Sequence, residues 1–367
     1  MSLRTIASVG NCMKTCMSTM AAQDNERKIL AAVIQMTSTA DKEANLSRAS
    51  SHVKRAASMG AKLAFLPEGF DFIGDTKNAA RELAEPIEGP TVTAYRKLAR
   101  EHGIALSLGG LHEAILPGED DGGKIRNTHV LIDGSGEILS TYSKAHLFDV
   151  EIPGKFKLRE SDWTTAGDEM KPPEAVPAAG GLRVGLGICY DLRFPEMAQY
   201  LARRGADVIT YPSAFTVATG LAHWESLLRA RAIETQCYVV AAAQTGKHNE
   251  KRSTFGHSVI IDPWGTVVAQ CGEGTLRIRL LQFDTNLTKD QFEFQVRALH
   301  SPKSIVVTYH LFARTCPWRG TGAPTSTASA SPATSSQSTN RCPSNSESPQ
   351  PYIRLASCSK RDSASCP

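Results

Sequence analysis

RVGLGICYDLRFPE, residues 183–196, contains a cysteine at the point where a short apolar strand gives way to charged residues and a proline. The apolar run is typical of a buried strand, and Pro195 can occupy the first turn of a following helix. Cys189 is therefore predicted at the carboxyl end of a strand, where open α/β folds gather reactive groups. A lone cysteine in such a run is also a common core residue, so its role depends on partners elsewhere in the chain.

Around this stretch, short apolar runs alternate with helical patterns. Buried-strand runs occupy residues 29–37, 62–68, 104–113, 183–190, 207–213 and 237–244. Apolar residues at three- and four-residue spacing predict helices within residues 41–61, 91–103, 195–206 and 221–236. Two hairpins, within residues 128–144 and 256–270, interrupt the alternation. The pattern predicts a single α/β domain with mixed sheets covered by helices.

The composition is that of a globular protein, because 367 residues with 41% hydrophobic content can bury a substantial core. The net charge of +4 is small and the Lys and Arg residues are dispersed, which argues against a nucleic-acid or membrane partner. Nine cysteines at irregular spacing, without a CxxC pair, argue against a zinc site and a secreted disulfide framework. We therefore expect a reducing, cytoplasmic environment.

Both ends of the chain differ from this pattern. Residues 1–28 contain Arg4, Lys14 and several Ser and Thr, but no acidic residue before Asp24. This composition is typical of a mitochondrial presequence, and a frayed terminus is the alternative. Residues 320–367 are mostly Ser, Thr, Pro and Ala, with too few large apolar side chains to offset the entropy of ordering, so a disordered tail is predicted.

Two further polar residues occupy positions like that of Cys189. FLPEGFDF, residues 65–72, ends a strand run in Glu68, and STYSKAHLFDVEIPG, residues 140–154, ends a hairpin in Lys144. Each residue alone is explained by a surface charge at the end of a strand. Together with Cys189 they form a consistent set for thiol chemistry.

The segments LAFLPEGFDF, YSKAHLFDVEIPG and GLGICYDLRFPE, in this order, resemble the Glu, Lys and Cys motifs of the nitrilase superfamily of carbon–nitrogen hydrolases. The resemblance runs from about residue 29 to about residue 274. YPSAFTVATGLAHWE and RARAIETQCYVVAAAQTGKHNEKRSTFGHS are similar to the branch that hydrolyses deaminated glutathione. The resemblance implies a four-layer α-β-β-α sandwich, a hydrolase domain over residues 29–282, and a divergent region of uncertain structure over residues 283–319.

The chemistry explains why these residue types belong together. A thiol is a poor nucleophile until it loses its proton, which Glu68 can accept and later return to the leaving group. The ammonium of Lys144 favours the thiolate form of Cys189. Lys144 and the backbone N–H of Tyr190 would stabilise the oxyanion, and water would then release the acid from a thioester. This reaction requires no metal and no organic cofactor.

The family pattern also implies a second glutamate after the lysine. Alignment of KFKLRESDW, residues 155–163, places it at Glu160, whereas Glu151 in DVEIPG is the alternative. Either residue is otherwise an exposed loop carboxylate.

The substrate side of the site is expected from residues close to the nucleophile and after the next strand. Tyr190 follows Cys189, and the guanidinium of Arg193 matches a substrate carboxylate, although an ion pair with a neighbouring acidic residue explains it equally well. Phe215 and Thr216 are predicted to line the pocket, with core packing as the alternative for Phe215. Basic residues of GKHNEKRS, residues 246–253, also suit an acidic substrate.

Three other functions are open at this point. A papain-like enzyme would need a His partner for Cys189, for which His146 is the best candidate. An omega-amidase would act on small α-keto acid monoamides such as α-ketoglutaramate. A catalytically weak partner protein is the third, because relatives of this branch associate with, or are fused to, Fhit-type proteins. The family usually forms homodimers or higher homo-oligomers, so we expect self-association.

Overall fold

The computed structural model describes residues 28–115, 122–152, 156–272, 277–284, 294–299 and 304–309. All of them lie within the unit Met1–Thr315. The leader predicted over residues 1–28 lies outside the described residues except for Lys28, and the tail predicted over residues 320–367 lies outside them entirely.

One sheet has nine strands. They are β1 (Lys28–Gln35), β2 (Leu63–Leu66), β3 (Ala105–Ala114), β4 (Ile125–Ile132), β5 (Ile138–Ser143), β8 (Thr164–Thr165), β17 (Arg277–Asp284), β18 (Phe294–Leu299) and β19 (Ser304–Tyr309). The order is β19-β18-β17-β1-β2-β3-β4-β5, and β8 pairs with β4. Strands β1, β2 and β3 run parallel to one another, whereas β17 and β4 flank them in antiparallel pairing.

The second sheet has six strands in the order β16-β15-β12-β11-β10-β9. They are β9 (Glu174–Val176), β10 (Leu182–Leu186), β11 (Val208–Thr210), β12 (Tyr238–Ala241), β15 (Val259–Ile261) and β16 (Val267–Gln270). Strands β10, β11 and β12 are parallel, so their carboxyl ends meet at one edge of the sheet.

Helices and short hairpins complete the described residues. The helices are α2 (Lys42–Ser58), α3 (Lys77–Leu83), α4 (Pro90–His102), α5 (Pro195–Arg203) and α6 (Val217–Thr235), and the 3-10 turns are η1 (Glu160–Asp162), η2 (Pro177–Ala179) and η3 (Cys189–Arg193). The separate hairpins are β6 (Asp149–Ile152) with β7 (Phe156–Arg159), and β13 (Thr245–Lys247) with β14 (Ser253–Phe255). Within the described residues, no helix is long and apolar enough to cross a membrane.

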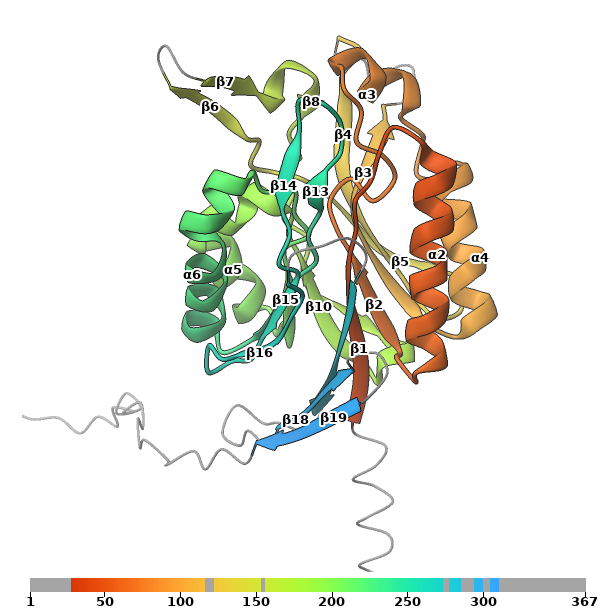
Figure 1. Cartoon of the computed structure of the whole chain (residues 1–367), viewed down its shortest axis with the longest axis vertical. Helices are drawn as coiled ribbons and strands as arrows, with labels where there is room; N and C mark the ends of the chain where they lie inside the picture. The colour runs from red at the N-terminus through yellow and green to blue at the C-terminus, as the bar shows by residue number, and fades with distance from the viewer. Residues whose placement is uncertain are drawn as a thin grey trace, which may run out of the picture. The chain divides into compact units, whose positions relative to one another are not determined.

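Helices cover the outer face of each sheet, α2 and α4 on one side and α5 and α6 on the other (Figure 1). Strand β1 shows why the layers form, because successive side chains of a strand point to opposite faces. Ala31 and Val33 belong to the core between the sheets, whereas Ala32 and Ile34 pack in the core beneath α2 and α4. The predicted α-β-β-α sandwich is confirmed.

Both predicted hairpins are present, as β4–β5 and β15–β16. The helices predicted within residues 41–61, 91–103, 195–206 and 221–236 are α2, α4, α5 and α6. The β6–β7 and β13–β14 hairpins were not predicted, because their strands have only three or four residues each. In the region 283–319, which the sequence leaves uncertain, β18 and β19 extend the larger sheet beside β17.

Two buried histidines make the stability of the fold depend on pH. The ring of His129 on β4 is fully buried, and burial lowers its pKa to about 4, although a hydrogen bond to the carbonyl of Gly187 opposes the shift. His248 follows β13, and its ring contacts the Ser38 carbonyl at 2.8 Å and the Thr254 hydroxyl at 2.7 Å. Burial lowers the pKa of His248 to about 4, and the charge of Arg252 acts in the same direction. Both rings are therefore neutral in the folded protein near pH 7.

We predict that the free energy of unfolding decreases as the pH falls from 7 to 5. The unfolded chain takes up a proton on each histidine near pH 6.5, whereas the folded protein resists this until about pH 4. The difference is on the order of 2 kcal/mol per histidine at pH 5. Urea unfolding at both pH values measures it, and His248→Gln should show a smaller decrease. An equal decrease in wild type and variant would contradict the role of His248.

Candidate active site

Three strands of the two sheets deliver the predicted Glu, Lys and Cys side chains to one place. Glu68 follows β2 by two residues, and Lys144 directly follows β5. Cys189 follows β10 of the other sheet and opens the 3-10 turn η3. The set is therefore assembled from residues that the sequence separates widely.

Cys189 has an unusual backbone conformation. Its φ of 46° lies in the left-handed region, which costs a non-glycine residue on the order of 1–3 kcal/mol. Hydrogen bonds hold the turn in place: Cys189 N donates to Pro212 O at 2.9 Å, and Ile188 N donates to Asp191 Oδ2 at 2.9 Å. The turn holds the thiol within hydrogen-bonding reach of Glu68.

Lys144 is the centre of the charged cluster. Its Nζ lies 3.0 Å from Glu68 Oε1, and 3.0 and 2.9 Å from the two carboxylate oxygens of Glu160. The side chain is only 2% exposed, and burial alone would lower the pKa of its ammonium. The two carboxylates outweigh burial and raise the pKa of Lys144 well above its usual value. Lys144 is therefore a permanent cation at this site.

Glu68 is held from several sides. Oε1 accepts hydrogen bonds from Lys144 and from Asn127 Nδ2 at 2.9 Å, and Oε2 accepts one from Ala214 N at 3.0 Å. Burial would raise the pKa of Glu68, but the Lys144 ammonium, the thiol hydrogen bond and the charge of Arg252 together lower it. Glu68 is therefore an ionised carboxylate at neutral pH, as a general base must be.

The thiol of Cys189 shows the opposite shift. Burial and the negative charge of Glu68 raise its pKa. Lys144 and the backbone N–H of Ala214 lower it by less, so the net shift is upward. The expectation that Lys144 favours the thiolate is correct in direction, but burial and Glu68 prevail. The resting site thus holds a neutral thiol beside a carboxylate, and the proton must move when the sulfur attacks.

The structure places Glu160, and not Glu151, beside Lys144. Glu160 starts η1, is 8% exposed, and its Oε2 also accepts a hydrogen bond from Phe148 N at 2.7 Å. Glu151 lies on β6, where it forms an exposed ion pair with Lys157 at 3.2 Å. The distance from Lys144 along the sequence does not decide between Glu160 and Glu151. The β6–β7 hairpin lies between Lys144 and Glu160, and it folds back on itself.

His146, the candidate partner for a papain-like mechanism, has a different contact. Its Nδ1 lies 2.7 Å from Asp191 Oδ1, and its ring stacks on Phe194 with centroids 3.6 Å apart. Asp191 also accepts hydrogen bonds from the hydroxyl of Tyr142 and from Ile188 N. This buried carboxylate ties the loop after Lys144 to the nucleophile turn. The side chains that act on the Cys189 thiol are Glu68 and Lys144, which favours the Glu–Lys–Cys set over the papain-like alternative.

A pocket opens at the thiol. It is lined by Phe148, Cys189, Tyr190, Arg193, Ala214, Phe215, Thr216 and Thr219. The predicted substrate-side residues Tyr190, Arg193, Phe215 and Thr216 are all among them. Sequence reasoning missed three of the lining residues. Phe148 comes from the segment between β5 and β6, and Ala214 and Thr219 come from the turn after β11 and the start of α6.

Arg193 has a defined orientation in this pocket. Its guanidinium carbon lies 5.8 Å from the ring centroid of Tyr190 and 6.0 Å from that of Phe215. Its Nη2 donates a hydrogen bond to His223 Nδ1 at 2.9 Å. Phe215 also packs edge-on against Trp224, so it serves both the pocket and the core.

Two glycines of β3 allow the parts of the site to meet. A Cβ at Gly109 would lie 2.0 Å from Pro212 Cβ. Gly110, at φ 76°, would place a Cβ 2.9 Å from Glu68 Cγ and 2.7 Å from Asn127 Oδ1. The pair GlyGly lies at the irregularity between Leu108 and Leu111, and it lets the smaller sheet approach Glu68.

No group of three or more His, Cys, Asp or Glu side chains in the described part of the chain could hold a metal ion. The candidate catalytic groups of the site are the Cys189 thiol, the Glu68 carboxylate and the Lys144 ammonium.

Most of the chain is similar to known proteins. Residues 30–290 match the carbon-nitrogen hydrolase family model. The deaminated glutathione amidase of Bos taurus is 52% identical over 266 residues, which cover 72% of this chain and 79% of the relative. The crystal structure of the C. elegans NitFhit protein is 50% identical with a TM-score of 0.65, covering 70% of this chain and 61% of that one.

A second similar structure has a modified active-site cysteine. It is a glutamate-to-glutamine mutant of the amidase from Nesterenkonia sp. AN1 that shows covalent addition of the acetamide moiety of fluoroacetamide at the active-site cysteine. It is 27% identical with a TM-score of 0.57, covering 70% of this chain and 90% of that one. On the family match and the identity to the bovine relative, the chain belongs to the carbon–nitrogen hydrolase family.

Proposed function

We propose that this protein hydrolyses the amide of deaminated glutathione, with Cys189 as the nucleophile and a thioester as the intermediate. The observation that carries the proposal is the buried contact of Lys144 with both Glu68 and Glu160, beside the thiol. The substrate follows from the activity in the name of the bovine relative, at 52% identity.

The first step is attack on the amide carbonyl. As the sulfur of Cys189 forms its bond to carbon, its proton passes to Glu68, which is ionised and within hydrogen-bonding reach. The carbonyl oxygen becomes an oxyanion. The Lys144 ammonium and the N–H of Tyr190, which belongs to the first turn of η3, stabilise it, and one such donor is worth roughly 3 kcal/mol.

The second step breaks the carbon–nitrogen bond. Glu68 returns its proton to the departing nitrogen, the amine leaves, and the acyl group stays on the sulfur as a thioester. Glu68, again ionised, then removes a proton from water as the water attacks the thioester. Release of the acid restores the thiol, so Glu68 accepts and returns one proton in each half of the reaction.

Glu160 has a positioning role in this scheme. Both of its oxygens contact Lys144, so it fixes the ammonium and balances part of its charge without contacting the thiol. Glu68 remains the carboxylate that exchanges protons, because it alone of the two has the thiol hydrogen bond.

Arg193 suits the acidic character of the proposed substrate. Deaminated glutathione is a peptide-like acid with terminal carboxylates, and a guanidinium binds a carboxylate through paired hydrogen bonds. The contacts with Tyr190, Phe215 and His223 hold the guanidinium at the pocket. We assign Arg193 to a substrate carboxylate, with the pocket residues Phe215 and Thr216 beside it.

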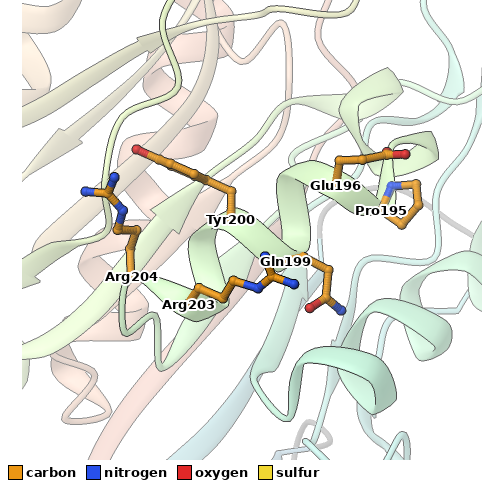
Figure 2. Close-up of a pocket in the computed structure, with 6 residues that line it drawn as sticks. All are labelled: Pro195, Glu196, Gln199, Tyr200, Arg203 and Arg204. Carbon is orange, nitrogen blue, oxygen red and sulfur yellow. The ribbon is translucent and has the colours of Figure 1, made fainter. Parts of the chain in front are cut away.

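We also propose that the protein forms a homodimer through α5 and α6, which pack against each other on the outer face of the smaller sheet (Figure 1). Helix α5 presents a groove lined by Pro195, Glu196, Gln199, Tyr200, Arg203 and Arg204 (Figure 2). Helix α6 exposes Val217 and Leu221, which are 44% and 74% accessible. In a two-fold contact, the acidic start of α5 can face the basic end of its copy.

Association with an Fhit-type protein is proposed as well, because the C. elegans relative is a nitrilase and fragile histidine triad fusion protein. This chain covers 54% of that relative, so the partner is an inference from the fusion.

The substrate is tested by comparing hydrolysis of deaminated glutathione and of α-ketoglutaramate, measured as release of the oxo acid. We expect a higher kcat/KM for deaminated glutathione and no hydrolysis by folded Cys189→Ala. Arg193→Gln should raise KM by about tenfold with little change in kcat, since a charge-assisted hydrogen bond contributes about 1.5–3 kcal/mol. A preference for α-ketoglutaramate would instead favour the omega-amidase, and activity in Cys189→Ala would exclude the thioester.

The role of Glu68 is tested by separating hydrolysis from alkylation. Glu68→Gln should lower kcat at least 10²-fold, because both proton transfers are lost. Iodoacetamide should still alkylate Cys189, and the pH at which alkylation is half-maximal should fall, because the carboxylate that raises the thiol pKa is gone. Glu151→Gln on the exposed hairpin is the matched control. A normal kcat in Glu68→Gln would rule out this base.

The dimer is tested by light scattering of the purified protein. The wild type should have twice the chain mass, and Leu221→Glu should shift it toward the monomer by placing a charge in the apolar contact. Lys97 on α4 is also exposed, and Lys97→Glu should leave the mass unchanged. A dimer that persists in Leu221→Glu would place the interface elsewhere. The same measurement with a purified Fhit-type protein added tests the second partner, and unchanged masses would count against it.

A further inference from the structure

One strand contacts both halves of the active site. Asn127 and His129 are two residues apart on β4, so their side chains lie on the same face of the larger sheet. Asn127 Nδ2 donates to Glu68 Oε1 at 2.9 Å and lies 3.4 Å from Glu160 Oε1. His129 Nδ1 lies 3.1 Å from the carbonyl oxygen of Gly187, two residues before the nucleophile.

The hydrogen bonds of His129 define its tautomer. A carbonyl oxygen can only accept, so Nδ1 carries the hydrogen and donates to Gly187. Nε2 must then accept from the hydroxyl of Ser107, which lies 2.7 Å away on β3. The ring is completely buried and its pKa is lowered to about 4, so the neutral form persists throughout the physiological range. His129 is therefore a constant donor to the strand that carries Cys189.

The neighbouring strand of the smaller sheet cannot donate to this carbonyl. Gly187 N donates to Thr210 O at 3.1 Å and Cys189 N donates to Pro212 O at 2.9 Å, so the parallel pairing places the nitrogen of Pro212 opposite the Gly187 carbonyl. Proline has no N–H, and the carbonyl therefore accepts from His129 instead. The bond from His129 thus crosses between the two sheets at the position where β10 ends and the nucleophile turn begins.

We propose that His129 is a positioning residue that sets the distance between the Cys189 thiol and the Glu68 carboxylate. The same strand fixes Glu68 through Asn127 and the nucleophile strand through His129, so the spacing of these two side chains on β4 fixes the relative positions of base and thiol. The hydrogen-bond partners of His129 are Ser107 and Gly187, and neither they nor His129 are among the residues that line the pocket.

The proposal predicts an effect on the chemical step alone. Proton transfer from sulfur to carboxylate requires hydrogen-bond distance, and a misplacement of about 1 Å can lower a rate by 10²-fold. Neither His129 nor Gly187 lines the substrate pocket. Loss of the His129 bond should therefore lower kcat and leave KM nearly unchanged.

The test compares His129→Leu with His129→Asn, two side chains of similar size of which only asparagine can donate to the Gly187 carbonyl. We expect kcat to fall about 10- to 100-fold in His129→Leu, with KM within about twofold, and His129→Asn to recover most of the loss. Thr210→Val is the matched control: its buried hydroxyl on the neighbouring strand has no partner among the described residues. Should His129→Leu not fold, His129→Met gives the same comparison.

Three results would overturn the proposal: wild-type kcat in a folded variant without a donor, equal losses in the asparagine and leucine variants, or a loss confined to KM. The inference rests on the proposed thioester reaction, but it does not rest on the substrate. The variants are assayed on whichever of deaminated glutathione and α-ketoglutaramate the wild type hydrolyses, with Cys189→Ala as the blank. Failure of the substrate assignment is therefore distinguishable from failure of the His129 role.

Discussion

The Lys144 ammonium, shared between Glu68 and Glu160, is the interaction on which the rest of the site depends. A buried ammonium without partners is strongly destabilising, and so is a buried carboxylate, so these groups must remain together. Three segments, at the ends of β2 and β5 and in η1, are thereby held at one edge of the larger sheet. One ammonium balances the charge of only one carboxylate, so the cluster keeps one negative charge. Glu68 uses this charge as the base for catalysis.

The catalytic residues are divided between the two sheets. The charged cluster belongs to the larger sheet, whereas the thiol comes from the smaller one, across the apolar core that both share. Gly109 and Gly110 reduce the separation at one point, where Pro212 and Glu68 approach the backbone of β3. The hydrogen bond that Ala214 N donates to Glu68 Oε2 joins the two sheets from the other side. Catalysis and sheet packing therefore depend on the same few close contacts.

Much of this arrangement could be predicted from the sequence because it depends on local patterns. Buried strands end in polar residues at Glu68, Lys144 and Cys189, and the alternation of strands and helices indicates the layers. Asn127 and His129 could not be found in this way, since they are ordinary members of a strand and only its pairing brings them to their partners. The choice between Glu160 and Glu151 likewise depends on how the β6–β7 hairpin folds back. The net pKa of the thiol depends on burial, which spacing along a chain does not reveal.

The raised pKa of Cys189 has a consequence for the survival of the enzyme. Peroxides and disulfides react with thiolates far more readily than with neutral thiols, and repeated oxidation of a cysteine ends in irreversible acids. A nucleophile whose pKa is raised by burial and by Glu68 is therefore less reactive toward oxidants between turnovers. Its reactivity appears only when an amide is in place to receive the sulfur while Glu68 takes the proton. The resting enzyme thereby limits oxidative loss of its own active-site cysteine.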